Sequence, residues 1–256
     1  MRTSAVQLIV NSQNKEGGWR YEPDGKEADI SVTVCQIMAL RAARNCGIAV
    51  PKPTVDQCVK YVLRSQKADG GFRPNLITIS GNIIGSQENN VLLADCHGVV
   101  VSGNCIYSAE SRNLLVEDSS LITIGSNSFR RHTPAAHAGV RLVRTKDTTI
   151  QGCSFQDEEP KGQASGASLL ELEDCRRVQV TGCQVIDGAP CGIDVVRGQE
   201  ISITSCTVAE TREAPVATAA IRFRGEGGEN LVALNTLVCP GGQPLDADDA
   251  SGVRQG

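Results

Sequence analysis

The sequence predicts a mainly β fold: a right-handed parallel β-helix of about seven rungs, each rung being one turn of the coil, after a short N-terminal α-helical module. Three patterns after residue 75 predict it. Seven segments share one alternation of apolar and polar residues, six of them follow a second strand, and one position repeats as a polar or thiol column. Self-similar units at a variable spacing are typical of a solenoid.

The first pattern is the alternation within the seven segments. Their first and third residues are mostly Val, Ile or Leu, and their second and fourth are mostly Thr, Ser or Gln, which predicts strands with one buried face. Successive segments begin 22, 23, 26, 30, 23 and 30 residues apart, so insertions are expected at particular turns. The segments are ITISGNII (77–84), VVVSGNCI (99–106), ITIGSNSF (122–129), TTIQGCSF (148–155), VQVTGCQV (178–185), ISITSCTV (201–208) and LVALNTLV (231–238).

The second pattern is an upstream strand in each rung, which also alternates. Its two inward positions are apolar in every copy, which predicts a second buried face in the same register. The inward pairs are Val91 and Leu93, Leu114 and Val116, Val140 and Leu142, Leu170 and Leu172, Ile193 and Val195, and Ile221 and Phe223.

The third pattern is the sixth position of each segment. It holds Asn82, Asn104, Asn127, Cys153, Cys183, Cys206 and Thr236. Adjacent rungs lie ~4.8 Å apart, so stacked amides can form a hydrogen-bonded ladder and thiols can fill the same bend. A metal or redox site is the alternative, but the sulfurs lack Cys-x-x-Cys spacing and no histidine shares their column. With 11 cysteines, an odd number, we expect mostly reduced thiols.

Residues 1–74 have helical periodicity, 75–241 form the predicted β-helix, and 242–256 are predicted to be a flexible tail. An internal repeat with an offset of 53 aligns VQLIVNSQNKEGGW (6–19) with VKYVLRSQKADGGF (59–72). Asp29 or Ser31 is expected to cap a helix that ends before Gly47, and a capping box from Thr54 to Gln57 is expected to open the next helix.

The repeat with its GGW and GGF endings resembles the α/α-toroid repeats of the squalene-cyclase and prenyltransferase superfamily, over about residues 4–73. The resemblance implies terpenoid chemistry only if an acidic cluster is present, and Asp29 alone does not provide one. One helical repeat also cannot enclose a cavity. We therefore expect the module to cover the open first rung of the β-helix; the alternative is a truncated or fused reading frame.

Residues of about 75–240 resemble the pectate-lyase-like β-helix superfamily, whose members include polysaccharide lyases, hydrolases, epimerases and proteins without catalysis. The resemblance implies a polysaccharide partner and does not choose among these activities. A noncatalytic scaffold of two degenerate repeat modules is therefore the alternative function. No complete catalytic motif of the superfamily is present in the sequence.

One column two residues beyond the segments carries the candidate site. It holds Ser86, Ser108, Arg131, Asp157, Asp187, Glu210 and Pro240. Three acids on successive rungs would have backbones ~5 and ~10 Å apart, close enough for a raised carboxyl pKa, for acid and base catalysis, or for a shared Ca²⁺ with Arg131 as proton acceptor. The alternative is a set of solvated turn residues. A functional groove predicts that the acids meet on an open surface, whereas a scaffold predicts that they splay apart or pair with cations.

Three insertions follow this column and could form the walls of a groove: RRHTPAAHA, QDEEPKGQASGA and AETREAPVATA. His132 and His137 lie in the first and are expected at the surface. A second exposed column, Leu92, Leu115, Arg141, Glu171, Asp194 and Arg222, is expected to be a solvated face of weak ion pairs.

Composition limits the remaining functions. The net charge of −4 provides no basic surface for nucleic acid, and no apolar run approaches the ~20 residues of a membrane span. Residues 1–15 lack the features of a secretory signal, so the chain as written is expected to stay in the cytoplasm, and export of a longer parent protein is the alternative.

Overall fold

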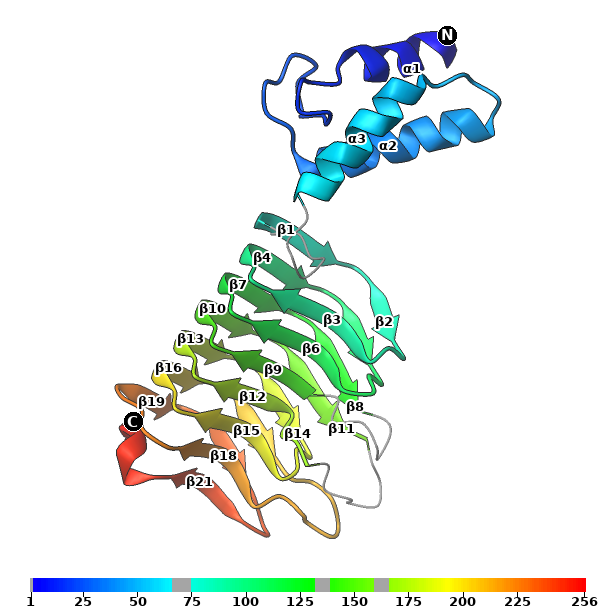
Figure 1. Cartoon of the computed structure of the whole chain (residues 1–256). Helices are drawn as coiled ribbons and strands as arrows, with labels where there is room; N and C mark the ends of the chain where they lie inside the picture. The colour runs from blue at the N-terminus through cyan, green and yellow to red at the C-terminus, as the bar shows by residue number, and fades with distance from the viewer. Residues whose placement is uncertain (1, 66–74, 132–138, 159–165) are drawn as a thin grey trace. The chain divides into compact units, whose positions relative to one another are not determined.

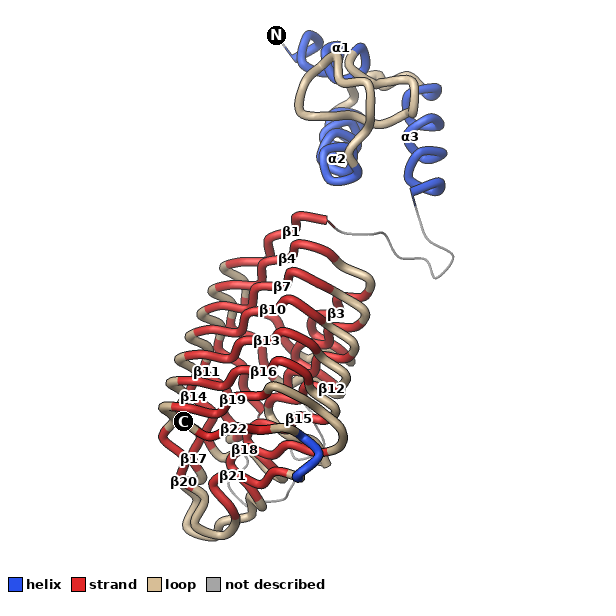
Figure 2. Tube along the Cα trace, turned by 90° about the vertical axis from the view of Figure 1, so that its left-hand side faces the viewer, coloured by secondary structure: helices blue, strands red, loops and turns tan. Residues whose placement is uncertain are grey.

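The computed structural model describes residues 2–65, 75–131, 139–158 and 166–256, which belong to two compact units, Met1–Arg73 and Pro74–Gly256 (Figure 1). The second unit is a parallel β-helix of stacked rungs, as the sequence predicts, and Figure 2 shows the stacking of its strands. Among the described residues, the helices are too short or too polar to cross a membrane.

The strands of the β-helix form three parallel sheets, and each of the seven complete rungs contributes one strand to each sheet, with β22 as an additional strand of the first. The first sheet contains β1 (Asn75–Ser80), β4 (His97–Ser102), β7 (Ser120–Gly125), β10 (Lys146–Gln151), β13 (Arg176–Thr181), β16 (Gln199–Thr204), β19 (Asn230–Ala233) and β22 (Val253–Gln255). The second sheet contains β2 (Ile83–Gly85), β5 (Cys105–Tyr107), β8 (Ser128–Arg131), β11 (Ser154–Asp157), β14 (Gln184–Ile186), β17 (Thr207–Ala209) and β20 (Thr236–Val238). The third sheet contains β3 (Asn89–Ala94), β6 (Arg112–Glu117), β9 (Gly139–Val143), β12 (Leu170–Glu173), β15 (Cys191–Val196), β18 (Ala219–Arg224) and β21 (Gln243–Ala247).

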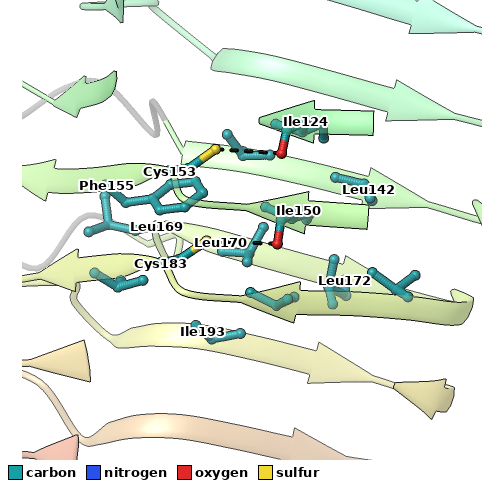
Figure 3. Close-up of a cluster of buried hydrophobic side chains, with 14 of the residues drawn as sticks. Ile124, Leu142, Ile150, Cys153, Phe155, Leu169, Leu170, Leu172, Cys183 and Ile193 are labelled. Carbon is teal, nitrogen blue, oxygen red and sulfur yellow. Dashed lines mark hydrogen bonds between the residues drawn. The ribbon is translucent and has the colours of Figure 1, made fainter. Parts of the chain in front are cut away.

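The core lies between the three sheets and is built from the alternating apolar positions. Side chains such as Ile150, Leu142 and Leu172 are fully buried and meet inside the coil (Figure 3). Phe129 and Phe155 stack in adjacent rungs with ring centroids 5.1 Å apart. The predicted inward pairs of the third sheet are register partners from rung to rung, which confirms the second sequence pattern.

Two predictions at the C-terminal end are wrong. Ser202 pairs with Leu231, so the seventh segment begins at Asn230. The ladder column therefore continues at Asn235 instead of Thr236, and the column of the candidate site continues at Cys239 instead of Pro240. Residues 242–256 are not a tail without structure, because β21 pairs with β18 and β22 pairs with β19. These strands add backbone hydrogen bonds at the edges of the sheets although their sequence does not alternate.

The predicted internal ladder is confirmed. The side-chain amide of Asn82 donates to Oδ1 of Asn104, and that of Asn104 donates to Oδ1 of Asn127, both at 3.0 Å. The next rungs replace the amides by buried thiols, and the sulfurs of Cys153 and Cys183 donate to carbonyl oxygens of the preceding rung (Figure 3). The pKa of the Cys183 thiol is raised, first by hydrogen bonds shared with Cys153 and Cys206 and then by burial.

Thiol labelling tests the burial of this column. We expect a thiol-alkylating reagent to modify the exposed Cys35 and Cys46 in the native protein, because the stacked thiols of Cys153, Cys183 and Cys206 are almost fully buried. Peptide mass spectrometry before and after unfolding measures the order of modification. Fast alkylation of Cys183 in the folded protein would contradict the buried ladder.

The helical unit contains α1 (Arg2–Asn11), α2 (Ile30–Asn45) and α3 (Lys52–Ser65). Asp29 caps α2 by accepting the backbone N–H groups of Ser31 and Val32, as predicted. The capping box at Thr54 is wrong, because α3 begins earlier, at Lys52. Trp19, Leu40 and Cys58 form the small core of this unit. The role of the unit as a cover of the β-helix stays a prediction.

Candidate functional site

The predicted acidic column follows the strands of the second sheet. Arg131 and Asp157 end β8 and β11 and are register partners, and Asp187 and Glu210 come directly after β14 and β17. The rungs are in the predicted order, but the side chains do not face an open surface. Their exposed fractions are 1% for Arg131, 3% for Asp157, 8% for Asp187 and 4% for Glu210.

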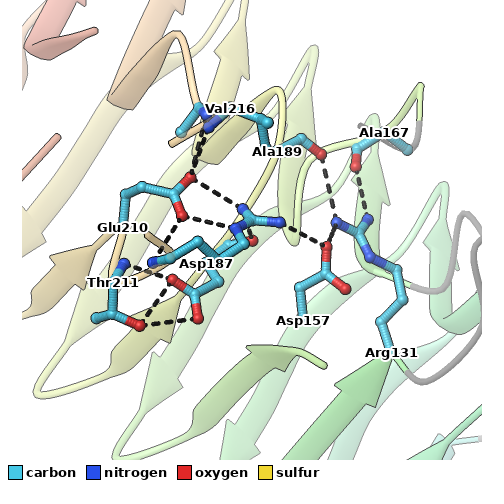
Figure 4. Close-up of polar contacts among 10 residues, drawn as sticks. Arg131, Asp157, Ala167, Asp187, Ala189, Glu210, Thr211 and Val216 are labelled. Carbon is cyan, nitrogen blue, oxygen red and sulfur yellow. Dashed lines mark hydrogen bonds and ion pairs between the residues drawn. The ribbon is translucent and has the colours of Figure 1, made fainter. Parts of the chain in front are cut away.

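The Arg131 side chain forms a buried ion pair with Asp157. Its Nη2 lies 2.5 Å from Oδ2 of Asp157 and 3.3 Å from the carbonyl oxygen of Ala189, and its Nη1 donates to the carbonyl oxygen of Ala167 at 2.9 Å (Figure 4). One guanidinium group at the end of β8 therefore binds the segments that follow β11 and β14.

A second arginine, Arg212, completes the network and was not predicted. It makes a bidentate pair with Glu210, at 2.6 and 2.9 Å, and donates to the carbonyl oxygen of Asp187 at 2.5 Å. Its Nη1 also lies 3.8 Å from Oδ2 of Asp157. Arg212 lies in an insertion without periodicity, so no repeating position marks it in the sequence.

The carboxylates of Asp187 and Glu210 also bind the backbone of the loop that follows β17. Asp187 accepts the backbone N–H of Thr211 at 2.5 Å and its hydroxyl at 3.0 Å, and Oε2 of Glu210 accepts the backbone N–H of Ala217 at 3.1 Å (Figure 4). Buried carboxylates that are paired and hydrogen-bonded in this way stabilise one loop conformation. One buried network thus joins Arg131, Asp157, Asp187, Glu210 and Arg212.

The burial of these side chains contradicts the open surface expected of a functional groove. Burial alone would raise the pKa of Glu210, but hydrogen bonds from Arg212 and Ala217 and the charge of Arg212 outweigh it and lower that pKa, so Glu210 is not a carboxyl group with a raised pKa. Within the described parts of the chain, no group of three or more His, Cys, Asp or Glu side chains could hold a metal. The Ca²⁺ site and a catalytic role for the column therefore stay predictions, which the burial and pairing of its side chains disfavour.

The lowered pKa of Glu210 predicts an acid sensitivity. Its stabilising contribution is present above the ordinary value of 4.5 and is lost as the pH falls through the lower pKa of the folded protein. We expect the melting temperature of the parent to fall on acidification through this range and to fall less steeply in Glu210→Gln. Thermal unfolding followed by circular dichroism between pH 3 and pH 7 measures both slopes; parallel curves would contradict the expectation.

An open cleft on the outer face of the third sheet is the second candidate site. It measures about 250 Å³ and lies over β9, β12, β15 and β18. Its lining residues are Arg141, Gly166, Ser168, Glu171, Leu172, Glu173, Pro190, Asp194, Val196, Arg222 and Arg224. The sheet supplies the floor, and the turns that contain Ser168 and Pro190 supply one wall.

Arginines engage both oxygens of the central carboxylate of the cleft, Asp194. Nε and Nη2 of Arg222 lie 3.3 and 2.8 Å from its oxygens, and the same atoms of Arg224 lie at 3.3 and 2.6 Å. The bond with Asp194 raises the pKa of Arg222 despite burial, so this guanidinium stays charged. Asp194 therefore lies between two cations.

The two glutamates of the cleft are paired in the same way. Oε2 of Glu171 lies 2.9 Å from Nη2 of Arg112 and 3.5 Å from Nη1 of Arg141, and Oε1 accepts the backbone N–H of Ser168 at 2.9 Å. The oxygens of Glu173 receive Arg141 at 2.5 Å and Arg197 at 2.8 Å. Every carboxylate oxygen of the cleft thus has a donor within the protein.

The prediction of a solvated face is wrong at Asp194 in this part of the third sheet, and the weakness of the ion pairs stays a prediction. Arg141, Glu171, Asp194 and Arg222 are the outward register partners that the sequence places in one column, but Asp194 is only 6% exposed. The sequence shows the alternating charges. It does not show the depth of the cleft, because the walls come from turns without periodicity.

His132 and His137 lie outside the described residues.

The fold and the sequence together define the class of this protein. The chain belongs to the right handed beta helix family, whose model matches residues 68–237. The match begins after the predicted helices, so the resemblance of the helical module to the toroid repeats stays a prediction. No curated protein matches the chain significantly.

Solved structures resemble the chain in fold alone. The mannuronan C-5 epimerase AlgE4 A-module of Azotobacter vinelandii is 14% identical over 73% of this chain and 60% of its own, with a TM-score of 0.49. The DFA-IIIase of Arthrobacter chlorophenolicus A6 without its lid is 13% identical over 72% and 58%, with a TM-score of 0.49. The ORF18 protein of Geobacillus virus E2 is 13% identical over 71% and 42%, with a TM-score of 0.47. The chain spans less than two thirds of each of these chains, and their activities carry no argument for this protein.

Proposed function

We propose that the β-helix unit binds a carbohydrate chain in the cleft of the third sheet. The observation that carries this proposal is an open cleft of about 250 Å³ lined mainly by arginines, carboxylates and a serine on a rigid parallel sheet. Ligand sites are concave and place a small number of fixed polar groups against the ligand. Planar guanidinium and carboxylate groups are suited to the hydroxyl groups of a sugar, and fixing them on adjacent strands lowers the ordering cost of binding.

Binding is favoured over bond cleavage. Glycoside hydrolysis needs one carboxyl group that donates a proton and a second that acts as base or nucleophile. In the cleft, the oxygens of Glu171 and Asp194 are engaged by arginines and a backbone N–H. In the buried network, Asp157 and Glu210 are paired with Arg131 and Arg212 and are covered from solvent. A lyase or hydrolase activity is therefore the weaker form of the proposal.

The experiment is a binding screen of the full chain against neutral and acidic polysaccharides, with product analysis in the same samples. Arg224→Ala removes one of the two cations of Asp194 at a half-exposed position of the cleft. Arg176→Ala is the matched control. Arg176 is similarly exposed and pairs with Glu200, but it lies on β13 of the first sheet, outside the cleft. We expect binding by the parent and the control and weaker binding by Arg224→Ala. Binding that both variants retain in full would contradict the site.

A noncatalytic scaffold is the second candidate function, and the buried network favours it. Acids that pair with neighbouring cations are what the scaffold alternative predicts for the column, and Arg131 and Arg212 supply those cations. A well-folded protein that binds no polysaccharide of the screen would support the scaffold and overturn the carbohydrate proposal.

A further inference from the structure

Helix α2 of the helical unit is apolar on both of its faces. One face is buried through Thr33 and Leu40. The opposite face, called the α2 face below, is formed by exposed residues that recur every three or four positions and include no charged side chain: Val34, Cys35, Met38, Ala39 and Ala42. A helix that is apolar all round is normally buried all round, and an exposed apolar patch marks an interaction surface.

The charges around the α2 face are separated between its two ends. Arg41 and Arg44 lie near the C-terminal end of the helix, which contains no acidic residue. Both arginines are exposed, and neither forms an ion pair within the described part of the chain. The segment that precedes the helix, residues 20–29, contains four acids and two bases, and its side chains surround an open hollow of about 560 Å³. The face therefore has an acidic end and a basic end.

We propose that the α2 face binds the same face of a second copy of this chain, with the two helices antiparallel. A two-fold axis makes such a contact self-complementary. The antiparallel arrangement places Arg41 and Arg44 of each copy beside the acidic segment 20–29 of the other, and it sets opposite ends of the helix dipoles side by side. A parallel arrangement brings like charges together. One chain carries both halves of this charge match, which favours a second copy over an unrelated partner.

The pairing is expected to be reversible, because the helix has 16 residues and offers only a narrow apolar stripe. Such a contact is smaller than a standard stable interface, so a dissociation constant of about 1–100 µM is expected. Cys35 lies within the stripe and is exposed in a single chain. Its alkylation should therefore be fast in dilute protein and become slower as the protein concentration rises.

Sedimentation equilibrium of the full chain between about 1 and about 200 µM measures the association. We expect the average mass to rise toward that of two chains, and we expect Met38→Asp to raise the dissociation constant at least ~tenfold. Met38 is 57% exposed, so the folded helical unit accommodates the substitution, which circular dichroism checks. Leu63→Asp is the matched control: Leu63 is 61% exposed on α3, outside the α2 face, and its replacement should leave the dissociation constant unchanged.

A charge reversal tests the two-fold geometry. One variant combines Arg41→Glu with Arg44→Glu, and a second combines Glu22→Arg with Glu27→Arg. Each variant alone brings like charges together at both ends of its own pair, so each is expected to be monomeric at a concentration at which the parent is dimeric. Their mixture has opposite charges at both ends and is expected to form a mixed dimer. A mixture that stays monomeric overturns the antiparallel arrangement.

Three further results would overturn the proposal. The first is a chain that stays monomeric over the whole range while Cys35 is alkylated at one constant, fast rate. The second is a dimer that Met38→Asp leaves intact, because its contact then lies elsewhere. The third is a monomer in which Cys35 is protected at every concentration, because another part of the same chain then covers the face. None of these results depends on whether the cleft of the third sheet binds a carbohydrate.

Discussion

Replacing Arg131 by methionine is expected to destabilise the β-helix unit by ~3–5 kcal/mol, because it removes the cation nearest to the buried carboxylate of Asp157, at 2.5 Å, whereas Arg212 lies 3.8 Å away. The substitution also removes the donors that hold the carbonyl oxygens of Ala167 and Ala189. Urea unfolding followed by the β-sheet signal in far-ultraviolet circular dichroism measures the free energy of unfolding.

Two controls separate the buried charge from the loss of a long side chain. Adding Asp157→Leu to Arg131→Met is expected to recover part of the stability, because the uncompensated charge is then absent. Arg144→Met breaks the solvent-exposed pair with Asp118, which is bidentate at 2.7 and 2.8 Å, and is expected to change stability much less. Equal losses in Arg131→Met and Arg144→Met would contradict the account of the buried network.

Replacing Phe155 by alanine is expected to cost ~3–5 kcal/mol, because the ring is fully buried and its removal leaves a cavity that the stacked rungs cannot close. The stacking contact with Phe129 in the preceding rung is lost as well. The neighbouring Gln156 points outward from the same strand, so Gln156→Ala is the matched control and should change little. The same unfolding experiment measures both, and a loss below about 1 kcal/mol in Phe155→Ala would contradict a tightly packed core.

The buried network and the cleft share parts of the same loops. Arg131 fixes the carbonyl oxygens of Ala167 and Ala189, and the residues that follow them, Ser168 and Pro190, line the cleft. Sites whose walls are held by a second layer of hydrogen bonds lose less entropy when a ligand binds. Arg131, paired with Asp157, thus holds the segments that form one wall of the cleft.

The strands could be predicted from the sequence because a buried face imposes a period of two and stacked rungs repeat it. The prediction for the last rung is wrong by one residue for a physical reason: Asn230 occupies an inward position that most other rungs fill with Val or Ile. Its Oδ1 accepts the backbone N–H of Ile201 at 2.8 Å, so a polar residue is satisfied there. The strands β21 and β22 were missed because pairing with a parallel neighbour uses the backbone and needs no alternation.

The candidate site was predicted less well, since register and burial are different properties. The spacing places Asp157, Asp187 and Glu210 on successive rungs correctly. Whether they face solvent depends on the turn insertions, and these have no repeating pattern from which Arg212 or the covering loop could be inferred. The cleft residues are visible in the sequence as alternating charges, but the arginine partners of each carboxylate appear only in the structure.

Amide hydrogen exchange in the presence of a bound saccharide tests the central claim most directly. The full chain is labelled with and without the tightest-binding oligosaccharide of the screen, and peptides are compared by mass spectrometry. We predict added protection in the peptides of β12, β15 and β18 and in the turns that contain Ser168 and Pro190, with no change in β13 and β16 on the first sheet. Protection confined to the first sheet, or to the helical unit, would contradict a carbohydrate site in the cleft of the third sheet.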